Sequence, residues 1–143
     1  MVLRNSILSF LLALVILLAG SADLVCQFKA ENADYYYKQG IEKYDNRRFN
    51  EAIKDFSKAI ELDPEYVKAY YKRGNISLRT GLLDSAMSDY QKAVEINPEY
   101  APAYHNIGIY HYFKKNYPEA IENFEKTIKY DPDYNKAYNN LGL

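Results

Sequence analysis

Apolar residues recur at intervals of three and four along most of this chain, the spacing of one face of an α-helix. One such stripe predicts a helix over residues 49–62 and comprises Phe49, Ala52, Ile53, Phe56, Ala59 and Ile60. Tyr36, Gly40 and Tyr44 are spaced by four and predict a preceding helix over residues 33–46. The short polar stretch Asn46–Arg48 separates the two stripes. The pattern therefore indicates a pair of helices joined by a tight turn.

The same pattern returns twice more with a step of 34 residues. Each unit ends with a similar short motif, which begins at Asp63, Asn97 and Asp131 and contains the prolines at positions 64, 98 and 132. Proline ends a helix because the residue before it is pushed out of the α region. We therefore predict repeats over residues 33–66, 67–100 and 101–134, followed by an incomplete fourth repeat over 135–143. A fixed period of this length is typical of stacked supersecondary units.

The recurring residues resemble the tetratricopeptide repeat family, in which an aromatic, a glycine, an alanine, a second aromatic, a second alanine and a proline recur in register. The three units supply Tyr36, Gly40, Ala52, Phe56, Ala59 and Pro64, then Tyr70, Gly74, Ala86, Tyr90, Ala93 and Pro98, then Tyr104, Gly108, Ala120, Phe124 and Pro132. Thr127 departs from the pattern by replacing the second alanine of the third unit. The resemblance covers about residues 33–143 and implies an all-α, right-handed superhelix of three helix-turn-helix repeats plus a truncated fourth.

Elementary packing explains these residue types independently of the resemblance. Glycine and alanine carry little or no side chain, so two antiparallel helices approach closely where Gly40 faces Ala52, and the aromatic residues fill the volume on either side. One helix pair cannot bury its own apolar stripe, and stacked neighbours complete a continuous core.

A different pattern occupies the N-terminus. Arg4 precedes an apolar run over residues 7–20, which ends on small residues up to Ala22. These are the three parts of a secretory signal peptide, and the run is short for a bilayer core, which needs about 20 residues. We predict a cleaved signal peptide over residues 1–22, with an uncleaved membrane anchor as the alternative, and a linker over 23–32. The protein is then exported, as a periplasmic, secreted or membrane-anchored chain. The single cysteine, Cys26, follows Val25 and fits a lipoprotein signal poorly.

The composition and the motifs make several classes of function unexpected. A formal net charge of -1 gives no field to attract a polyanion, so we expect no nucleic-acid partner. His105 and His111 are six residues apart and do not share one helix face, so we expect no metal. No phosphate-binding loop and no catalytic constellation can be singled out, and we expect neither a cofactor nor an enzyme activity within these residues.

The resemblance implies a concave groove lined by the first helix of each pair. The candidate peptide-binding residues in that groove are Tyr37, Ile41, Tyr44, Lys68, Tyr71, Asn75, His105, Ile109 and Tyr112. Among them we expect Tyr37, Tyr71 and His105 to face an open groove. For Tyr44, Leu78 and Tyr112 the favoured alternative is packing between neighbouring repeats. Of the residues that bind acidic chaperone peptides in one branch of the family, this chain matches Asn75 alone, so such a ligand is not expected.

The sequence thus predicts a non-enzymatic protein-interaction scaffold that binds a peptide or partner protein. Two alternatives stay open. In the first alternative, the repeats are the substrate-recruiting arm of a larger enzyme such as a glycosyltransferase, in line with a fourth repeat that stops at Leu143. In the second alternative, the repeats self-associate through the uncapped third repeat. A membrane tether through residues 7–20 is compatible with each.

The packing argument yields a first prediction. Ala86→Leu inserts extra volume where the two helices of the middle repeat cross, and we expect it to cost about 1–3 kcal/mol of stability. Thermal unfolding measures the effect, and an unchanged melting temperature would contradict the assignment.

Overall fold

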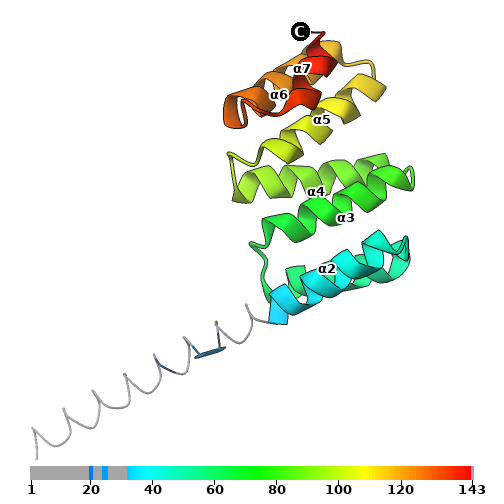
Figure 1. Ribbon diagram of the computed structural model, residues 1–143, viewed down its shortest axis with the longest axis vertical. Helices are drawn as coiled ribbons and strands as arrows, with labels where there is room; N and C mark the ends of the chain where they lie inside the picture. The colour runs from blue at the N-terminus through cyan, green and yellow to red at the C-terminus, as the bar shows by residue number, and fades with distance from the viewer. Residues whose placement is uncertain (1–19, 21–23, 26–31, 143) are drawn as a thin grey trace, which may run out of the picture.

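The computed structural model describes residues 20, 24–25 and 32–142 of the 143-residue chain. Its described repeats are helical, and no strand occurs in this part of the chain. Residues 32–45 form the first helix of the array. The helices that follow are α2 (Phe49–Leu62), α3 (Val67–Arg79), α4 (Leu83–Ile96), α5 (Ala101–Phe113), α6 (Tyr117–Tyr130) and α7 (Asn135–Leu141). Figure 1 shows them stacked in chain order, with α7 at the far end from the first helix.

Each helix of α2–α7 packs against its neighbours in the sequence. The predicted close crossings are present, because every glycine in the middle of a first helix lies against an aromatic ring. A Cβ atom added at Gly40, Gly74 or Gly108 would lie 2.6 or 2.7 Å from a ring carbon of Phe56, Tyr90 or Phe124, respectively. Real Cβ atoms do not approach that closely, so glycine sets the distance between the helices of each pair.

The core lies between the helices as three connected clusters along the stack. Small and large residues alternate in it: Ala52 and Phe56 in the first repeat, Ala86 and Tyr90 in the second. The next repeat contributes to each cluster, with Ile76 from α3 joining the first and Ala137 from α7 joining the third. The predicted dependence of each helix pair on its neighbour is therefore present in the packing.

The motif that ends each repeat forms the same turn in all three repeats. The side chains of Asp63, Asn97 and Asp131 accept a hydrogen bond from the backbone N–H two residues later, at 3.0, 3.0 and 3.1 Å. Their backbone carbonyls accept a second bond from Tyr66, Tyr100 and Tyr134, each at 3.1 Å. A short polar side chain that bonds its own backbone in this way favours a turn over a continuing helix.

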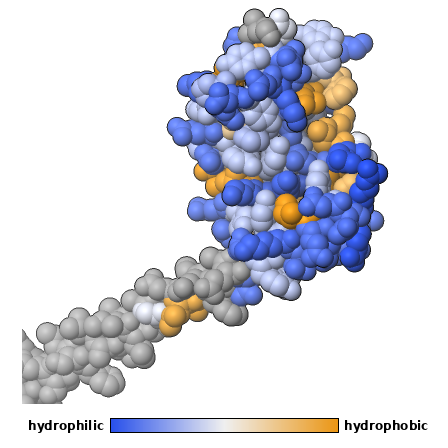
Figure 2. All heavy atoms as spheres, in the orientation of Figure 1, coloured by the Kyte–Doolittle hydropathy of each residue, from blue (hydrophilic) through white to orange (hydrophobic). Residues whose placement is uncertain are grey.

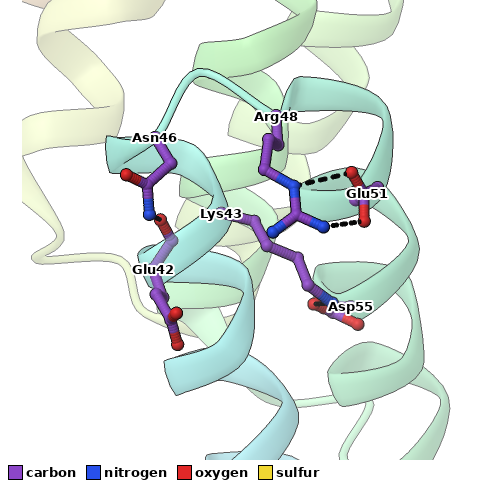
Figure 3. A network of polar contacts seen from close by, with 6 residues as sticks. All are labelled: Glu42, Lys43, Asn46, Arg48, Glu51 and Asp55. Carbon is purple, nitrogen blue, oxygen red and sulfur yellow. Dashed lines mark hydrogen bonds and ion pairs between the residues drawn. The ribbon is translucent and has the colours of Figure 1, made fainter.

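The turn inside each repeat requires a left-handed residue. Arg47, Gly81 and Lys115 occupy equivalent places and have φ of 59°, 80° and 61°. Glycine adopts this conformation freely, whereas arginine and lysine meet a steric cost. Two ion pairs flank the first turn: Lys43 pairs with Asp55, and Arg48 contacts both carboxylate oxygens of Glu51, as Figure 3 shows.

The N-terminal predictions fall almost entirely outside the described residues. This holds for the signal peptide or anchor over residues 1–22, the linker over 23–32 and Cys26. Within the part of the chain that the structure describes, no helix has the length and apolar character needed to cross a bilayer.

Lys115→Gly tests the cost of the left-handed turn. We expect it to raise the free energy of unfolding by about 0.5–1 kcal/mol, because the removal of the steric conflict outweighs the greater freedom that glycine loses on folding. Gly81→Ala is the matched control and should lower the stability by a similar amount. Chemical denaturation measures both, and a shift of the same sign in the two variants would contradict the interpretation.

Candidate functional site

A line of aromatic rings follows one edge of the stack, built from the first helix of each repeat and the tyrosine that closes it. Tyr37 lies 5.0 Å from Tyr66 between ring centres, Tyr71 lies 5.4 Å from Tyr100, and His105 lies 5.0 Å from Tyr134. We call these six residues the ring column. Each first-helix ring also packs on the buried aromatic residue of its own repeat, at 5.8, 6.0 and 5.7 Å from Phe56, Tyr90 and Phe124. Because the pairs repeat at every level, the column runs the length of the array.

The hydroxyl groups of the three closing tyrosines, Tyr66, Tyr100 and Tyr134, stay protonated at neutral pH. Burial raises the pKa of Tyr66 and of Tyr100, and it raises the pKa of Tyr134 to about 12. Nearby phenols, Tyr71 among them, add to the effect on the pKa of Tyr134. Tyr66 donates its hydroxyl to Asp34 at 2.9 Å. The column therefore offers neutral groups that donate and accept hydrogen bonds beside large apolar rings.

A chain of polar side chains runs beside the column from the second repeat into α7. Asn75 accepts hydrogen bonds from the Tyr90 hydroxyl at 2.9 Å and from the Asn106 amide at 2.8 Å. Asn106 in turn lies 3.2 Å from Nδ1 of His105, and the amide of Asn140 lies 3.1 Å from Nε2 of the same ring. One arrangement satisfies every group: the Nδ1–H of neutral His105 donates to the side-chain oxygen of Asn106, and its Nε2 accepts from the amide of Asn140. The polar chain thus joins α3, α5 and α7.

The first helices differ sharply in charge. Helix α3 has the sequence VKAYYKRGNISLR, with four cationic residues and no carboxylate, whereas α5, APAYHNIGIYHYF, has no lysine, arginine or carboxylate. Arg73 pairs with Asp89 at 2.7 Å. Lys72 and Arg79 make no ion pair among the described residues and lie over the Tyr44 ring, 5.3 and 6.0 Å from its centre. A cationic segment on α3 therefore adjoins an uncharged one on α5.

The predicted site residues lie on residues 32–45, α3 and α5, and their exposure differs from one to the next. His105 was expected to face an open groove, and this is wrong: it is only 5% exposed, because Tyr134 and Asn140 cover it. Tyr37 and Tyr71 are half-buried by the rings of the column. The other candidates divide between packed residues and exposed ones. Ile41 and Ile109 are half-buried and pack against the cores, whereas Lys68 is exposed.

Tyr44 and Leu78 pack between repeats, and they lie against the first and second core clusters, respectively. Tyr112 does not pack in this way: it is 57% exposed, and none of the described helices lies over it as α3 lies over Tyr44. Sequence reasoning also missed the contribution of Tyr66, Tyr100 and Tyr134. The signal was present, since these tyrosines recur with the 34-residue step.

A separate apolar surface lies where the described array ends. Two adjoining hollows of about 390 and 430 Å³ open between α5, α6 and α7, and we call them together the end hollow. Its lining includes Tyr112, Tyr117, Ile121, Phe124, Glu125 and Leu141. Figure 2 shows apolar residues gathered on the side of the molecule where α5 ends and α6 begins. Within the described residues no group of three or more metal-binding side chains is arranged to hold an ion.

Comparison with known proteins gives consistent matches. Tetratricopeptide repeat models match residues 37–101 and 101–134. A search of the curated proteins gave no match. Among solved structures, MamA is 31% identical with a TM-score of 0.69, and the aligned region covers 75% of this chain and 63% of that one. YrrB, described as having an unusual peptide-binding site, is 28% identical with a TM-score of 0.70, covering 78% of this chain and 58% of that one.

The first repeat domain of Spaghetti (RPAP3), solved with the HSP90 peptide SRMEEVD, has a TM-score of 0.74 at 24% identity. That alignment covers 78% of this chain and 89% of the other. At this level of identity the likeness shows the fold alone.

Burial of His105 predicts a pH dependence of stability. Burial lowers its pKa from the ordinary value of 6.5, while the bond to Asn106 acts in the opposite direction. The unfolded chain therefore takes up the proton first, so the stabilising contribution of neutral His105 is complete above pH 6.5 and is lost as the pH falls toward the folded pKa. Denaturation between pH 7.5 and about 5 should show this loss, and His105→Gln should show a smaller one. Equal slopes in the two proteins would contradict the assignment.

Proposed function

Because this chain belongs to the tetratricopeptide repeat family, we propose that it is a non-enzymatic interaction module that binds a peptide or partner protein. The proposed binding surface is a groove along the first helices of the repeats, residues 32–45, α3 and α5. The observation that carries the proposal is the ring column, which repeats the same aromatic pair in three successive units.

The chemistry of this surface suits recognition better than catalysis. Half-buried tyrosines lose little conformational freedom on binding and combine an apolar face with a hydroxyl, so they are effective anchors at interfaces. Their hydroxyls remain neutral, and the polar chain through Asn75 and Asn106 is already hydrogen-bonded. No described group near the column is activated as a nucleophile, since burial raises the pKa of its phenols.

Two features beside the column define what a ligand meets. The cations of α3, exposed Lys68 among them, favour carboxylate groups, while α5 offers an uncharged surface that ends in exposed Phe113. The peptide-binding site of YrrB, a protein of the same fold, supports a peptide or protein ligand for this chain as well. We place the module outside the cytoplasm, a proposal that rests on the apolar run over residues 7–20.

Two other functions are alternatives to peptide binding in the groove. The exposed side chains of the third repeat, Tyr112, Phe113, Tyr117 and Ile121, favour self-assembly, which light scattering of the full chain would detect as a rise in mass with concentration. A role as the substrate-recruiting arm of a larger enzyme is the second alternative, and this chain aligns with only 63% of MamA and 58% of YrrB. A catalytic domain encoded in the same reading frame would establish it.

The groove is tested by removing its polar groups while keeping its rings. The variant Tyr37→Phe, Lys68→Glu, Tyr71→Phe preserves the aromatic packing and reverses one exposed charge, and we expect it to weaken the capture of native partners roughly fivefold or more. Quantitative mass spectrometry of proteins captured from the source cells is the measurement.

The matched control places similar changes elsewhere on the surface. Tyr35 and Lys54 are both exposed, and Tyr35→Phe with Lys54→Glu should leave capture unchanged. Circular dichroism must show equal helicity in all three proteins. If the groove variant keeps every partner at wild-type yield, binding does not use this surface.

A further inference from the structure

The two ends of the helix pairs carry opposite charge. The turns inside the repeats, residues 45–48, 79–82 and 113–116, contain five cations, which are Arg47, Arg48, Arg79, Lys114 and Lys115, and the single carboxylate of Asp45. The motifs that end the repeats contain five carboxylates and no cation, and the carboxylates are Asp63, Glu65, Glu99, Asp131 and Asp133. We call these motifs, residues 63–66, 97–100 and 131–134, the closing motifs. The formal net charge of -1 averages over this difference.

The charged turns lie together in space. Figure 1 shows the three internal turns on one edge of the array and the closing motifs on the opposite edge. Contacts join neighbouring turns: the guanidinium group of Arg79 lies 5.1 Å from the ring centre of Phe49, and Nζ of Lys114 lies 3.8 Å from a carboxylate oxygen of Asp84. We call residues 45–48, 79–82 and 113–116 the turn edge.

The two edges act as separate charges. Helix α3 has 13 residues and is about 20 Å long, which is more than the screening length of about 8–10 Å in physiological salt. A charged surface that approaches the turn edge is therefore attracted by its cations and is screened from the carboxylates of the closing motifs.

Three cations of the turn edge are available to a ligand. Arg47, Arg79 and Lys115 are exposed, and none of them makes an ion pair within the part of the chain that the structure describes. Arg48 differs from them because it contacts both carboxylate oxygens of Glu51. The free cations come from three different repeats, so the positive charge extends along the edge.

Two large apolar side chains lie on the same edge. Leu82 is 56% exposed and Phe113 is 65% exposed. Leu82 belongs to the middle repeat and has a repeat on either side. Arg79 occupies the place in the second repeat that Phe113 occupies in the third, and it is exposed although α5 follows it. The exposure of both apolar residues is therefore a property of their positions in the turns.

This combination of residues fits the surface of an anionic bilayer. Cations attract the phosphate groups of anionic lipids, and exposed aliphatic and aromatic side chains enter the boundary between headgroups and acyl chains. The tips of three turns form a row, which suits contact with an extended surface. An uncleaved apolar run over residues 7–20 would keep the array near such a surface.

We propose that the turn edge binds bilayers that contain anionic phospholipids. Leu82 and Phe113 insert between the headgroups, and Arg47, Arg79 and Lys115 lie at phosphate groups. The carboxylates of the closing motifs then point away from the membrane. The ring column includes the tyrosines of those motifs, so one molecule can bind a bilayer and a protein partner at the same time.

The experiment places a reporter on each edge of the full chain. The sequence contains no tryptophan, so one introduced tryptophan reports its own surroundings. Phe113→Trp labels the turn edge, and Glu99→Trp labels the exposed part of a closing motif. Each protein is titrated with vesicles of phosphatidylcholine alone and with vesicles of an equal mixture of phosphatidylcholine and phosphatidylglycerol.

We expect the two reporters to behave differently. The emission of the Phe113→Trp protein should shift to shorter wavelength with the anionic mixture and should be quenched when brominated phospholipid is included. Phosphatidylcholine alone should cause neither change. The Glu99→Trp protein should show neither change with either kind of vesicle, because its reporter is held away from the bilayer.

Charge substitutions in the Phe113→Trp protein locate the contact. Arg47→Gln with Lys115→Gln removes two free cations of the turn edge and should weaken partitioning into the anionic vesicles at least about fivefold. Lys129→Gln with Lys136→Gln is the matched control, since it removes the same charge from two exposed lysines beside a closing motif. This control should leave the partitioning unchanged.

Leu82→Ser tests the apolar contribution in the same protein. We expect it to weaken partitioning about threefold or more, because an aliphatic side chain no longer enters the bilayer. Leu82 is the residue that precedes α4 as its N-cap, a place where serine is favourable, so the fold is retained. Equal melting curves confirm that each variant folds.

Four results would overturn the proposal. The first is an unchanged emission of the Phe113→Trp protein with anionic vesicles, and the second is equal quenching of the two reporters. The third is equal weakening by the two pairs of charge substitutions, which would show an effect of net charge alone. The fourth is self-association without lipid that Arg47→Gln with Lys115→Gln abolishes, which would assign the turn edge to the closing motifs of a second copy.

Discussion

The contact between a glycine and an aromatic ring sets the geometry on which the remaining structure depends. Gly40, Gly74 and Gly108 each lie against the ring of their own repeat, and a single methyl group would be too close to it. This contact fixes the separation of the two helices in each pair. The first helix of each pair then carries its outer residues in a constant register, so that Tyr37, Tyr71 and His105 meet Tyr66, Tyr100 and Tyr134 at similar distances of 5.0, 5.4 and 5.0 Å, although the angles between the rings differ.

The helices and the core could be predicted from the sequence because they depend on neighbours within one repeat or the next. The alternation of small and large residues at a helical spacing reports those contacts directly. Exposure at the site depends on more distant groups. His105 was expected to be open, yet its cover comes from Tyr134 and from Asn140, 35 residues away. Likewise Gly81 marks a left-handed turn in the sequence, whereas Arg47 and Lys115 adopt the same conformation without any such mark.

Two surfaces with different chemistry result from this architecture. The ring column repeats through the three units and is half-buried, apart from His105, which is buried. The end hollow is more exposed and apolar, with one carboxylate at its rim. The two surfaces therefore differ in exposure and in the polar groups that they carry.

The junctions between repeats use different chemistry although their backbones are alike. Arg79 over Tyr44 and Phe49 connects the first repeat to the second, Asn75 with Asn106 connects the second to the third, and His105 with Asn140 connects the third to α7. Each connection needs both of its partners, and the pairing changes from one junction to the next: Asn106 and Asn140 are equivalent residues, yet the first bonds Asn75 and the second His105. The side chains at the junctions therefore depend on the order of the repeats. A repeat that is duplicated or exchanged with its neighbour keeps its own fold, but its side chains no longer match those of the repeats on either side.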